Sequence, residues 1–317
     1  MTQILDLAFP FFALILFGFL AARVWGHGEA GLQWLNIFLI WFALPALIFL
    51  IIADAPFEKL VDWPFITATT AVTAAAFLTV FSVARLAFKA STTEAAIQST
   101  SGSYGNVGYM GLPLAVAFFG PQAAVPAALV FCFDCTLQFT LTAFLATLGH
   151  AANEEAHWGK IVLRVLWQVF GHPFIIATIL GAIASAIEFK APGALGTILR
   201  MLMNSAGPVA LFAIGVTVGL REVSKLGPEL PFLVAMKVLL QPLLAFAVMS
   251  FMPGLDPLWR HVAIMMAALP TASNAFILAS QYRTYVAGAS TTVIITTVIS
   301  AFTIPLIVYL IQAGLIP

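Results

Sequence analysis

The chain has 317 residues, of which 62% are hydrophobic and 8% charged, and its 13 basic and 13 acidic side chains give a formal net charge of zero. Soluble globular domains carry about 25% charged residues, so this composition excludes a soluble enzyme. It also excludes a nucleic-acid-binding protein, which needs a basic surface to neutralise phosphates. We therefore expect an all-α polytopic membrane protein whose surroundings are the lipid bilayer.

Continuous apolar runs along the chain predict ten transmembrane helices, because a membrane-spanning helix needs about 20 apolar residues. The runs do not alternate at every second residue, which favours helices over barrel strands. The first run lacks a basic segment before it, so we interpret it as a span and not as a cleavable signal. The predicted spans, numbered 1 to 10 below, are 4–23, 32–52, 64–88, 94–119, 122–148, 161–187, 196–220, 230–252, 259–282 and 285–312.

The distribution of Lys and Arg near the span ends predicts the orientation. Basic residues favour the cytoplasmic side, and more of them lie on the odd-numbered connections. Both termini are then predicted to lie outside the cytoplasm, with 150–160 as a short cytoplasmic linker, in the cell inner membrane. The odd connections carry Arg23, Arg85, Lys89, Lys160, Arg164, Arg221, Lys225 and Arg283, and the even ones Lys59, Lys190, Arg200 and Arg260.

The two halves of the chain share a proline pattern. Pro10 in span 1 aligns with Pro173 in span 6 at an offset of 163 residues, and the same offset aligns Pro45 with Pro208. An odd number of spans per half inserts the halves in opposite directions. The pattern therefore predicts two inverted five-helix repeats, 1–149 and 161–317, although chance similarity between apolar helices is an alternative.

Spans 4 and 9 carry helix-breaking residues at corresponding depths. Span 4 has four glycines between 102 and 111 followed by Leu112-Pro113, and span 9 contains Leu269-Pro270, at an offset of 157 that implies a small gap. Glycine and proline both disfavour a helix interior. Freed backbone groups are tolerated in a membrane only against protein or a wet cavity, so the breaks predict a binding site near the midplane. Close helix packing at the glycines is the alternative.

Polar side chains lie among these breaks, and such groups are costly in a bilayer unless they are used. The N-terminus of a half-helix offers free N–H groups and about half a positive charge, which suits a carboxylate. We expect a small anion, and neither a catalytic residue nor a metal site. The candidate substrate-binding residues are Ser103, Tyr104, Asn106, Pro113, Pro270, Thr271, Ser273 and Asn274.

Asp134 in span 5 and Lys237 in span 8 are charges well inside predicted spans. Intramembrane charges usually mark function and tend to pair. We predict that they lie near one another and couple Na⁺ or H⁺ movement to transport, with Gln138 and Gln241 one helical turn further along. No other cofactor is expected. The alternatives are that Lys237 extends to the membrane surface and that Asp134 forms a static structural pair.

The segments 105–114 and 269–276 resemble the fourth- and ninth-span signatures of the auxin efflux carrier family, and 43–46 resembles its second span. The resemblance covers the whole chain, and the short linker is similar to that of prokaryotic members. It implies a scaffold of spans 1, 2, 6 and 7, a transport domain of spans 3–5 and 8–10, and a crossing of spans 4 and 9 at Pro113 and Pro270. It also implies elevator-type transport of small organic anions, auxin-like or malonate-like, and a possible homodimer.

The sequence thus predicts a secondary transporter for a small organic anion. Two other classes stay open, namely an intramembrane enzyme or a channel that uses Asp134 and Lys237. The glycines of span 4 lack the order and flanking residues of a nucleotide-binding loop, and no hydrolase signature occurs. The inverted repeat with two broken helices favours alternating access over either alternative.

Overall fold

The computed structural model describes residues 2–25, 28–151, 167, 170–220 and 227–316. Throughout this part the regular secondary structure is helical, apart from an isolated antiparallel bridge between Gly105 and Thr271. The all-helical class predicted from the sequence is confirmed. Most of the predicted linker and the start of predicted span 6 lie outside the described residues, as do Lys160, Arg164, Arg221 and Lys225 of the orientation argument.

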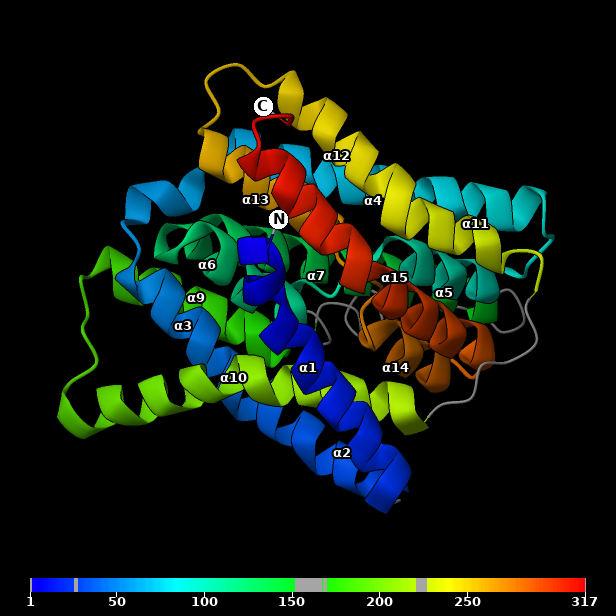
Figure 1. Ribbon diagram of the computed structural model, residues 1–317. Coiled ribbons are helices and arrows are strands. Elements are labelled where there is room, and N and C mark those ends of the chain that lie inside the picture. The colour runs from blue at the N-terminus through cyan, green and yellow to red at the C-terminus, as the bar shows by residue number, and fades with distance from the viewer. Residues whose placement is uncertain (1, 26–27, 152–166, 168–169, 221–226, 317) are drawn as a thin grey trace.

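Helices of the first half run in chain order through five of the predicted ranges (Figure 1). They are α1 (Thr2–Trp25), α2 (Gly28–Phe38), η1 (Leu39–Ala43), α3 (Leu44–Asp54), η2 (Phe57–Val61), α4 (Trp63–Leu86), α5 (Thr92–Ser103), η3 (Val107–Gly111), α6 (Leu112–Phe119), η4 (Pro121–Ala123) and α7 (Ala124–Ala151). The second half contains α9 (Pro173–Ala186), α10 (Gly193–Leu220), α11 (Leu230–Ala235), η5 (Met236–Leu240), α12 (Gln241–Ser250), α13 (Pro257–Ala267), α14 (Asn274–Gln281) and α15 (Val286–Gln312).

Six helical runs in the described residues are long and apolar enough to cross a membrane: Ala30–Asp54, Trp63–Leu86, Pro121–Gly149, Gly193–Leu220, Leu230–Ser250 and Val286–Gln312. Phe9–Trp25, Val107–Phe119 and Pro173–Ala186 are shorter apolar helices. Large apolar side chains such as Trp34 (73% exposed) and Phe302 (75% exposed) point outward. Such a surface suits contact with lipid, so the chain is a multi-pass membrane protein.

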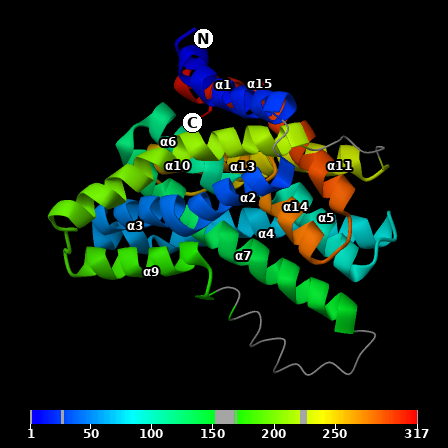
Figure 2. The ribbon, with the colours of Figure 1, turned by 90° about the horizontal axis from the view of Figure 1, so that it is seen from below.

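Small residues allow the closest helix contact, which joins α1 to α10. A side chain at Gly18 would meet the carbonyl oxygen of Phe212, and one at Gly215 would meet that of Ile15. Glycine at both positions lets the two backbones touch, as in small-residue packing between membrane helices. On the same side of the molecule α3 lies along α9, whereas α4 packs against α5 and α12 (Figures 1 and 2).

Three π-helical turns share one sequence feature, a proline two residues after the turn. Pro45 follows η1, Pro113 follows η3 and Pro242 follows η5. Proline has no N–H to donate and its ring clashes with the preceding turn. A widened turn accommodates the ring without ending the helix, so these prolines lie inside nearly continuous helical runs.

Candidate functional site: the crossing of two broken helices

The breaks in predicted spans 4 and 9 cross each other at an antiparallel bridge. The Asn106 N–H donates to the Pro270 carbonyl at 2.8 Å, and the Ala272 N–H donates to the Tyr104 carbonyl at 2.9 Å. Gly105 faces Thr271 between these two bonds. The bridge satisfies backbone groups that the broken helices leave free, which is a requirement inside a membrane. Four half-helix ends, those of α5, η3, α13 and α14, therefore meet at one point.

Thr271 holds the two breaks together with both of its polar groups. Its hydroxyl donates to the Ser101 carbonyl near the end of α5 at 2.7 Å, and its N–H donates to the hydroxyl of Thr296 on α15 at 3.0 Å. Thr271 is completely buried. It thus occupies the crossing as predicted, but its hydroxyl already has a protein partner, so its observed contacts are those of a structural residue.

The break in span 4 lies at 104–106, within the predicted glycine-rich segment, but the crossing expected at Pro113 is wrong. Pro113 lies in the first turn of α6, eight residues after Gly105 and away from the bridge. It contacts α10, where a side chain at Gly207 would lie 3.3 Å from its ring. The π-turn η3, which ends two residues before it, accommodates the proline ring within the helical run. Pro270 does lie at the bridge, so only one of the two predicted crossing prolines takes part.

The ends of the half-helices on either side of the two breaks can be compared by their offset along the chain. The half-helices before the breaks end at Ser103 and Ala267, which are 164 positions apart. The half-helices after the breaks begin at Val107 and Asn274, which are 167 positions apart. Both offsets are close to the 163 that aligns Pro10 with Pro173, whereas the offset of 157 from Leu-Pro matching is not.

A small pocket lies beside the bridge and is lined by four of the eight predicted binding residues. Asn106, Ser273 and Asn274 line it together with the aromatic rings of Phe131 and Phe174. The Ser273 hydroxyl has no hydrogen-bond partner among the described residues. The pocket volume is about 10 Å³, which holds about one water molecule. This conformation is therefore closed to a carboxylate, and the two rings are the obstacle.

Tyr104 and Ser103 differ in their relation to this pocket. Tyr104 lines it, and its hydroxyl lies 3.5 Å from the Asn274 amide nitrogen. Ser103 instead lies behind the bridge, where its hydroxyl accepts from the Gln138 amide at 2.8 Å and donates to the Ser99 carbonyl. The structure thus places Tyr104 with the other candidates and separates Ser103 from them.

Lys237 is fully buried and lies at the crossing, not apart from it as its place in span 8 suggests. Its ammonium group donates to the Ala267 carbonyl at the end of α13 at 2.8 Å and to Gln241 Oε1 at 2.7 Å. It also lies 3.3 Å from where a side chain at Gly105 would begin. A positive charge at a helix C-terminus is favourable, so Lys237 caps the first half of broken span 9.

Asp134 lies on the other side of Ala267. It is 5% exposed and lines a second small pocket with Thr73, Ala245 and Ala267. Its Oδ1 has no hydrogen-bond partner among the described residues. Asp134 and Lys237 interact electrostatically, yet among these described side chains no direct ion pair joins them. Ala267 of α13 is therefore shared by the two sites, because its carbonyl accepts from Lys237 and it lines the pocket of Asp134.

A much larger cavity lies beside α6, the helix that follows the break in span 4. Its volume is about 830 Å³, and Pro113 and Pro208 form part of its wall. Most of its lining is apolar, with five polar or charged side chains: Asp54, Gln122, Arg200, Asn204 and Asp256. A large apolar cavity with few convergent polar groups is typical of a site for small molecules.

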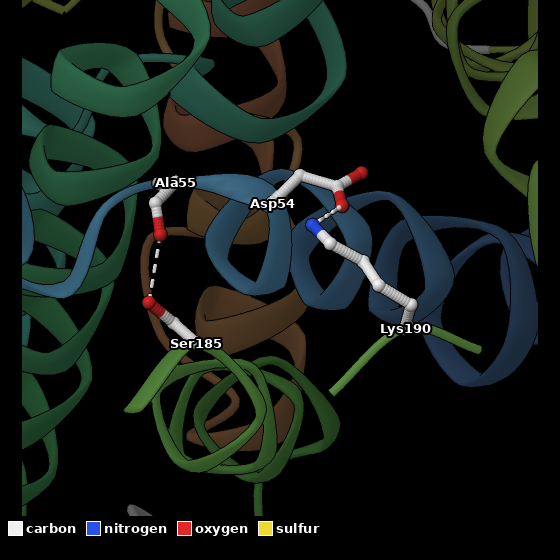
Figure 3. Close-up of polar contacts among 4 residues, drawn as sticks. All are labelled: Asp54, Ala55, Ser185 and Lys190. Atoms are coloured by element: carbon white, nitrogen blue, oxygen red, sulfur yellow. Dashed lines mark hydrogen bonds and ion pairs between the residues drawn. The ribbon is translucent and has the colours of Figure 1, made fainter. Parts of the chain in front are cut away.

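One edge of this cavity is fixed by contacts between the end of α3 and the end of α9 (Figure 3). Lys190 Nζ lies 2.8 Å from Asp54 Oδ1, and the Ser185 hydroxyl donates to the Ala55 carbonyl at 2.7 Å. The ion pair is exposed, so it adds little stability. It does neutralise the Asp54 carboxylate at the cavity wall.

Several residues of these sites could not be identified from the sequence. Phe131 and Phe174 look like ordinary core aromatics, and Thr296 belongs to a run of hydroxyl residues in span 10. That run is the one available signal, since buried hydroxyls at helical spacing indicate a polar inner face. Arg200 is visible in the sequence only as an orientation charge.

A membrane protein with two crossed, broken helices at a polar pocket belongs to the class of small-molecule transporters. The family model described as "Membrane transport protein" matches residues 3–308. The chain therefore belongs to this membrane transport family, which confirms the membership predicted from the motifs of spans 4 and 9.

Named relatives agree with this assignment. The chain is 36% identical to a "Putative malonate transporter" of Rhizobium meliloti (strain 1021), over 100% of this chain and 98% of that protein. It is 26% identical to an "Uncharacterized transporter" of Methanothermobacter thermautotrophicus over 63% of each chain. It is 21% identical to "Uncharacterized transporter YfdV" of Escherichia coli (strain K12) over 95% of each. The protein is a transporter and not an enzyme, which removes the intramembrane-enzyme alternative.

Proposed function

We propose that this protein is a secondary transporter that carries a small organic carboxylate, of the malonate type, across the cell inner membrane. The observation that carries the proposal is the pocket where Asn106, Ser273 and Asn274 meet the starts of two half-helices. Helix N-termini and neutral amides favour a carboxylate without a fixed counter-charge. The named function of the 36% identical relative supports the same substrate class.

Ten spans in two inverted repeats explain the crossing best. The described helices meet all ten predicted ranges, and the breaks recur at offsets of 164 and 167 residues. Two repeats of opposite orientation bring two broken helices together antiparallel at one depth, and the bridge between Gly105 and Thr271 is antiparallel. Each half-helix start would then lie opposite the other, on the two sides of the bound anion.

Elevator-type motion would separate the helices into two bodies. The scaffold consists of spans 1, 2, 6 and 7, where α1 packs on α10 and α3 on α9. The transport domain consists of spans 3–5 and 8–10, which contain the crossing. The 830 Å³ cavity lies between these groups, as its lining from both shows. A moving domain needs such space, and the closed pocket at the crossing would open when Phe131 and Phe174 shift.

Uptake into proteoliposomes is the direct test. The purified protein would be tested with radiolabelled malonate, succinate, acetate and indole-3-acetate, with and without Na⁺, H⁺ and potential gradients. We expect saturable, countertransport-competent uptake of at least one carboxylate. Flux that never saturates would indicate a channel, and no flux with any carboxylate would reject the proposed substrate class.

The substrate-contact role of the amides has its own test. In the double variant Asn106→Ala, Asn274→Ala we expect at least a tenfold loss of kcat/KM for uptake, since each amide supplies a hydrogen bond to the anion. The control is Gln33→Ala, which removes an exposed amide on α2. Unchanged uptake in the double variant, with equal amounts of protein in the vesicles, would reject these contacts.

Asp134 and Lys237 are proposed to couple transport to Na⁺ or H⁺ movement. The unpartnered Asp134 oxygen and its interaction with the Lys237 charge across Ala267 support this role. We expect Asp134→Asn to retain substrate binding but to lose the dependence of uptake on the proton or sodium gradient. The same gradient dependence in Asp134→Asn and the natural protein would assign Asp134 a structural role instead.

The orientation and the oligomer are proposals of the same kind. Both termini are expected outside the cytoplasm, and a reporter fused after residue 317 that is active only in the cytoplasm would reverse this. A homodimer would form through the scaffold spans, and cross-linking in native membranes followed by mass measurement would detect it.

A further inference from the structure

We propose that the 830 Å³ cavity contains a second carboxylate-binding site, formed by Arg200 and Asn204 of α10, which the anion occupies on its way to or from the helix crossing. The transport role of this site rests on the function proposed above. Its existence as an anion site does not, because it follows from the charges of the cavity wall.

The two residues share one face of α10. They are four positions apart, so they lie one above the other on the helix surface. Both line the cavity. Arg200 lies seven residues into a helix that begins at Gly193, about 10 Å along its axis. One nitrogen of its guanidinium group lies 3.2 Å from where a side chain at Gly196 would begin, so the side chain extends one turn back toward the start of the helix.

Arg200 differs from the acidic residues of the cavity wall because its charge has no protein partner among the described residues. Asp54 is paired with Lys190 at 2.8 Å, as Figure 3 shows. The Asp256 carboxylate accepts the Leu258 N–H at the start of α13 at 2.8 Å. Arg200 has no hydrogen-bond or ion-pair partner among the described residues. Arg200 is therefore the cation of the cavity lining that has no protein partner in the part of the chain that the structure describes, while Asp256 keeps its negative charge at the start of α13.

A carboxylate fits this arrangement chemically. Guanidinium binds carboxylate with two parallel N–H···O bonds, and the Asn204 amide can donate a further one. The apolar walls suit the hydrocarbon part of an organic acid. A lipid phosphate offers oxygen acceptors as well, but the polar lining near Gln122 and Asp256 suits a water-borne anion better. The connections after spans 2, 4 and 8 contribute to this cavity, and the predicted orientation places them outside.

Thiol labelling can measure the local charge without any transport. The reporter is Met203→Cys, which lines the cavity, in a protein whose buried cysteines are removed by Cys132→Ala and Cys135→Ala. Rates would be compared for an anionic and a cationic methanethiosulfonate reagent of similar size, in phosphatidylcholine vesicles. We expect the anionic reagent to react at least threefold faster relative to its rate with free thiol. Arg200→Gln should abolish this preference, and Arg200→Lys should keep it.

The neighbouring ion pair supplies a matched control. Lys190→Ala leaves Asp54 uncompensated at the wall, so the preference for the anionic reagent should fall. Adding Asp54→Asn to that variant should restore it. A preference that is the same in Arg200→Gln as in the parent would overturn the proposal, whatever the transport assays give.

Ligand protection tests the binding step. Millimolar malonate should slow labelling of Met203→Cys several-fold in the parent and not in Arg200→Gln, while equal ionic strength of chloride should have no such effect. Protection by added phosphatidylglycerol but not by malonate would assign the site to lipid and reject a substrate role. In uptake assays, Arg200→Gln should raise KM with little change in kcat. Protection by malonate without uptake would keep this site and reject the proposed function.

Discussion

The two helix breaks are joined at one bridge but are stabilised by different chemistry. In span 4 only three residues separate α5 from η3, and the end of α5 is held by neutral hydrogen bonds from Thr271 and Gln138. In span 9 six residues separate α13 from α14, and the end of α13 is held by the Lys237 ammonium. A break closed by a buried charge depends on that one residue far more than a break closed by amides and hydroxyls.

Lys237→Met should give the largest effect, because it leaves the Ala267 carbonyl, Gln241 and the buried Asp134 without their cation. Hydrogen bonds to a charged group contribute about 1.5 to 3 kcal/mol each, so losing two of them costs about 3 kcal/mol or more. The matched change at the other break is Gln138→Met, which removes one hydrogen bond worth about 1 kcal/mol. Thermal unfolding in detergent would compare them, and equal losses would contradict the difference between the breaks.

Gly108→Ala should come next. The added methyl group would lie 2.7 Å from the Phe131 ring, which must shift. Overpacking of this kind costs about 2 kcal/mol. Because Phe131 also closes the pocket at the crossing, we expect altered uptake kinetics in addition to lower stability. Gly102→Ala is the comparison, because its methyl group would meet the buried Val80 and Leu233 side chains at the longer distances of 3.0 and 3.2 Å, so a smaller loss of stability is expected.

Thr271→Val tests how much the Thr271 hydroxyl stabilises the contact between the two breaks. The substitution keeps the side-chain shape but removes the hydroxyl that donates to the Ser101 carbonyl. Hydrogen bonds between membrane helices contribute about 1 kcal/mol, so a loss of this size is expected in denaturant unfolding. Thr197→Val, whose hydroxyl is exposed and bonds only within α10, should change little.

Pro113→Ala should have the smallest effect on stability, about 0.5 kcal/mol or less, since surface and helix-start changes of this kind are mild. Pro270→Ala alters the bridge itself and should reduce uptake more strongly. If uptake were reduced equally in both variants, the result would support a crossing at Pro113 and Pro270 instead.

Sequence reasoning located the helical segments and the family, because apolar runs and motif residues are local signals. It identified the glycine-rich segment that contains the break in span 4 but placed the crossing at Pro113, because a Leu-Pro pair resembles a break whether or not a π-turn precedes it. The true break depends on Gly105 finding a backbone partner in span 9. Likewise, depth along span 8 gave no sign that Lys237 reaches the end of α13. Contacts between distant helix ends are set by packing, which a single sequence does not specify.

The π-turns before Pro45, Pro113 and Pro242 have a consequence for how these helices present their faces. Each turn holds roughly one residue more than an α-helical turn, and one residue corresponds to a rotation of about 100°. A helical wheel that treats Leu230–Ser250 as one α-helix therefore gives the wrong direction for the side chains after the π-turn. The face that α11 turns toward lipid therefore corresponds to a different side of α12. Each π-turn, together with its proline, divides its span into two segments whose side chains point in different directions.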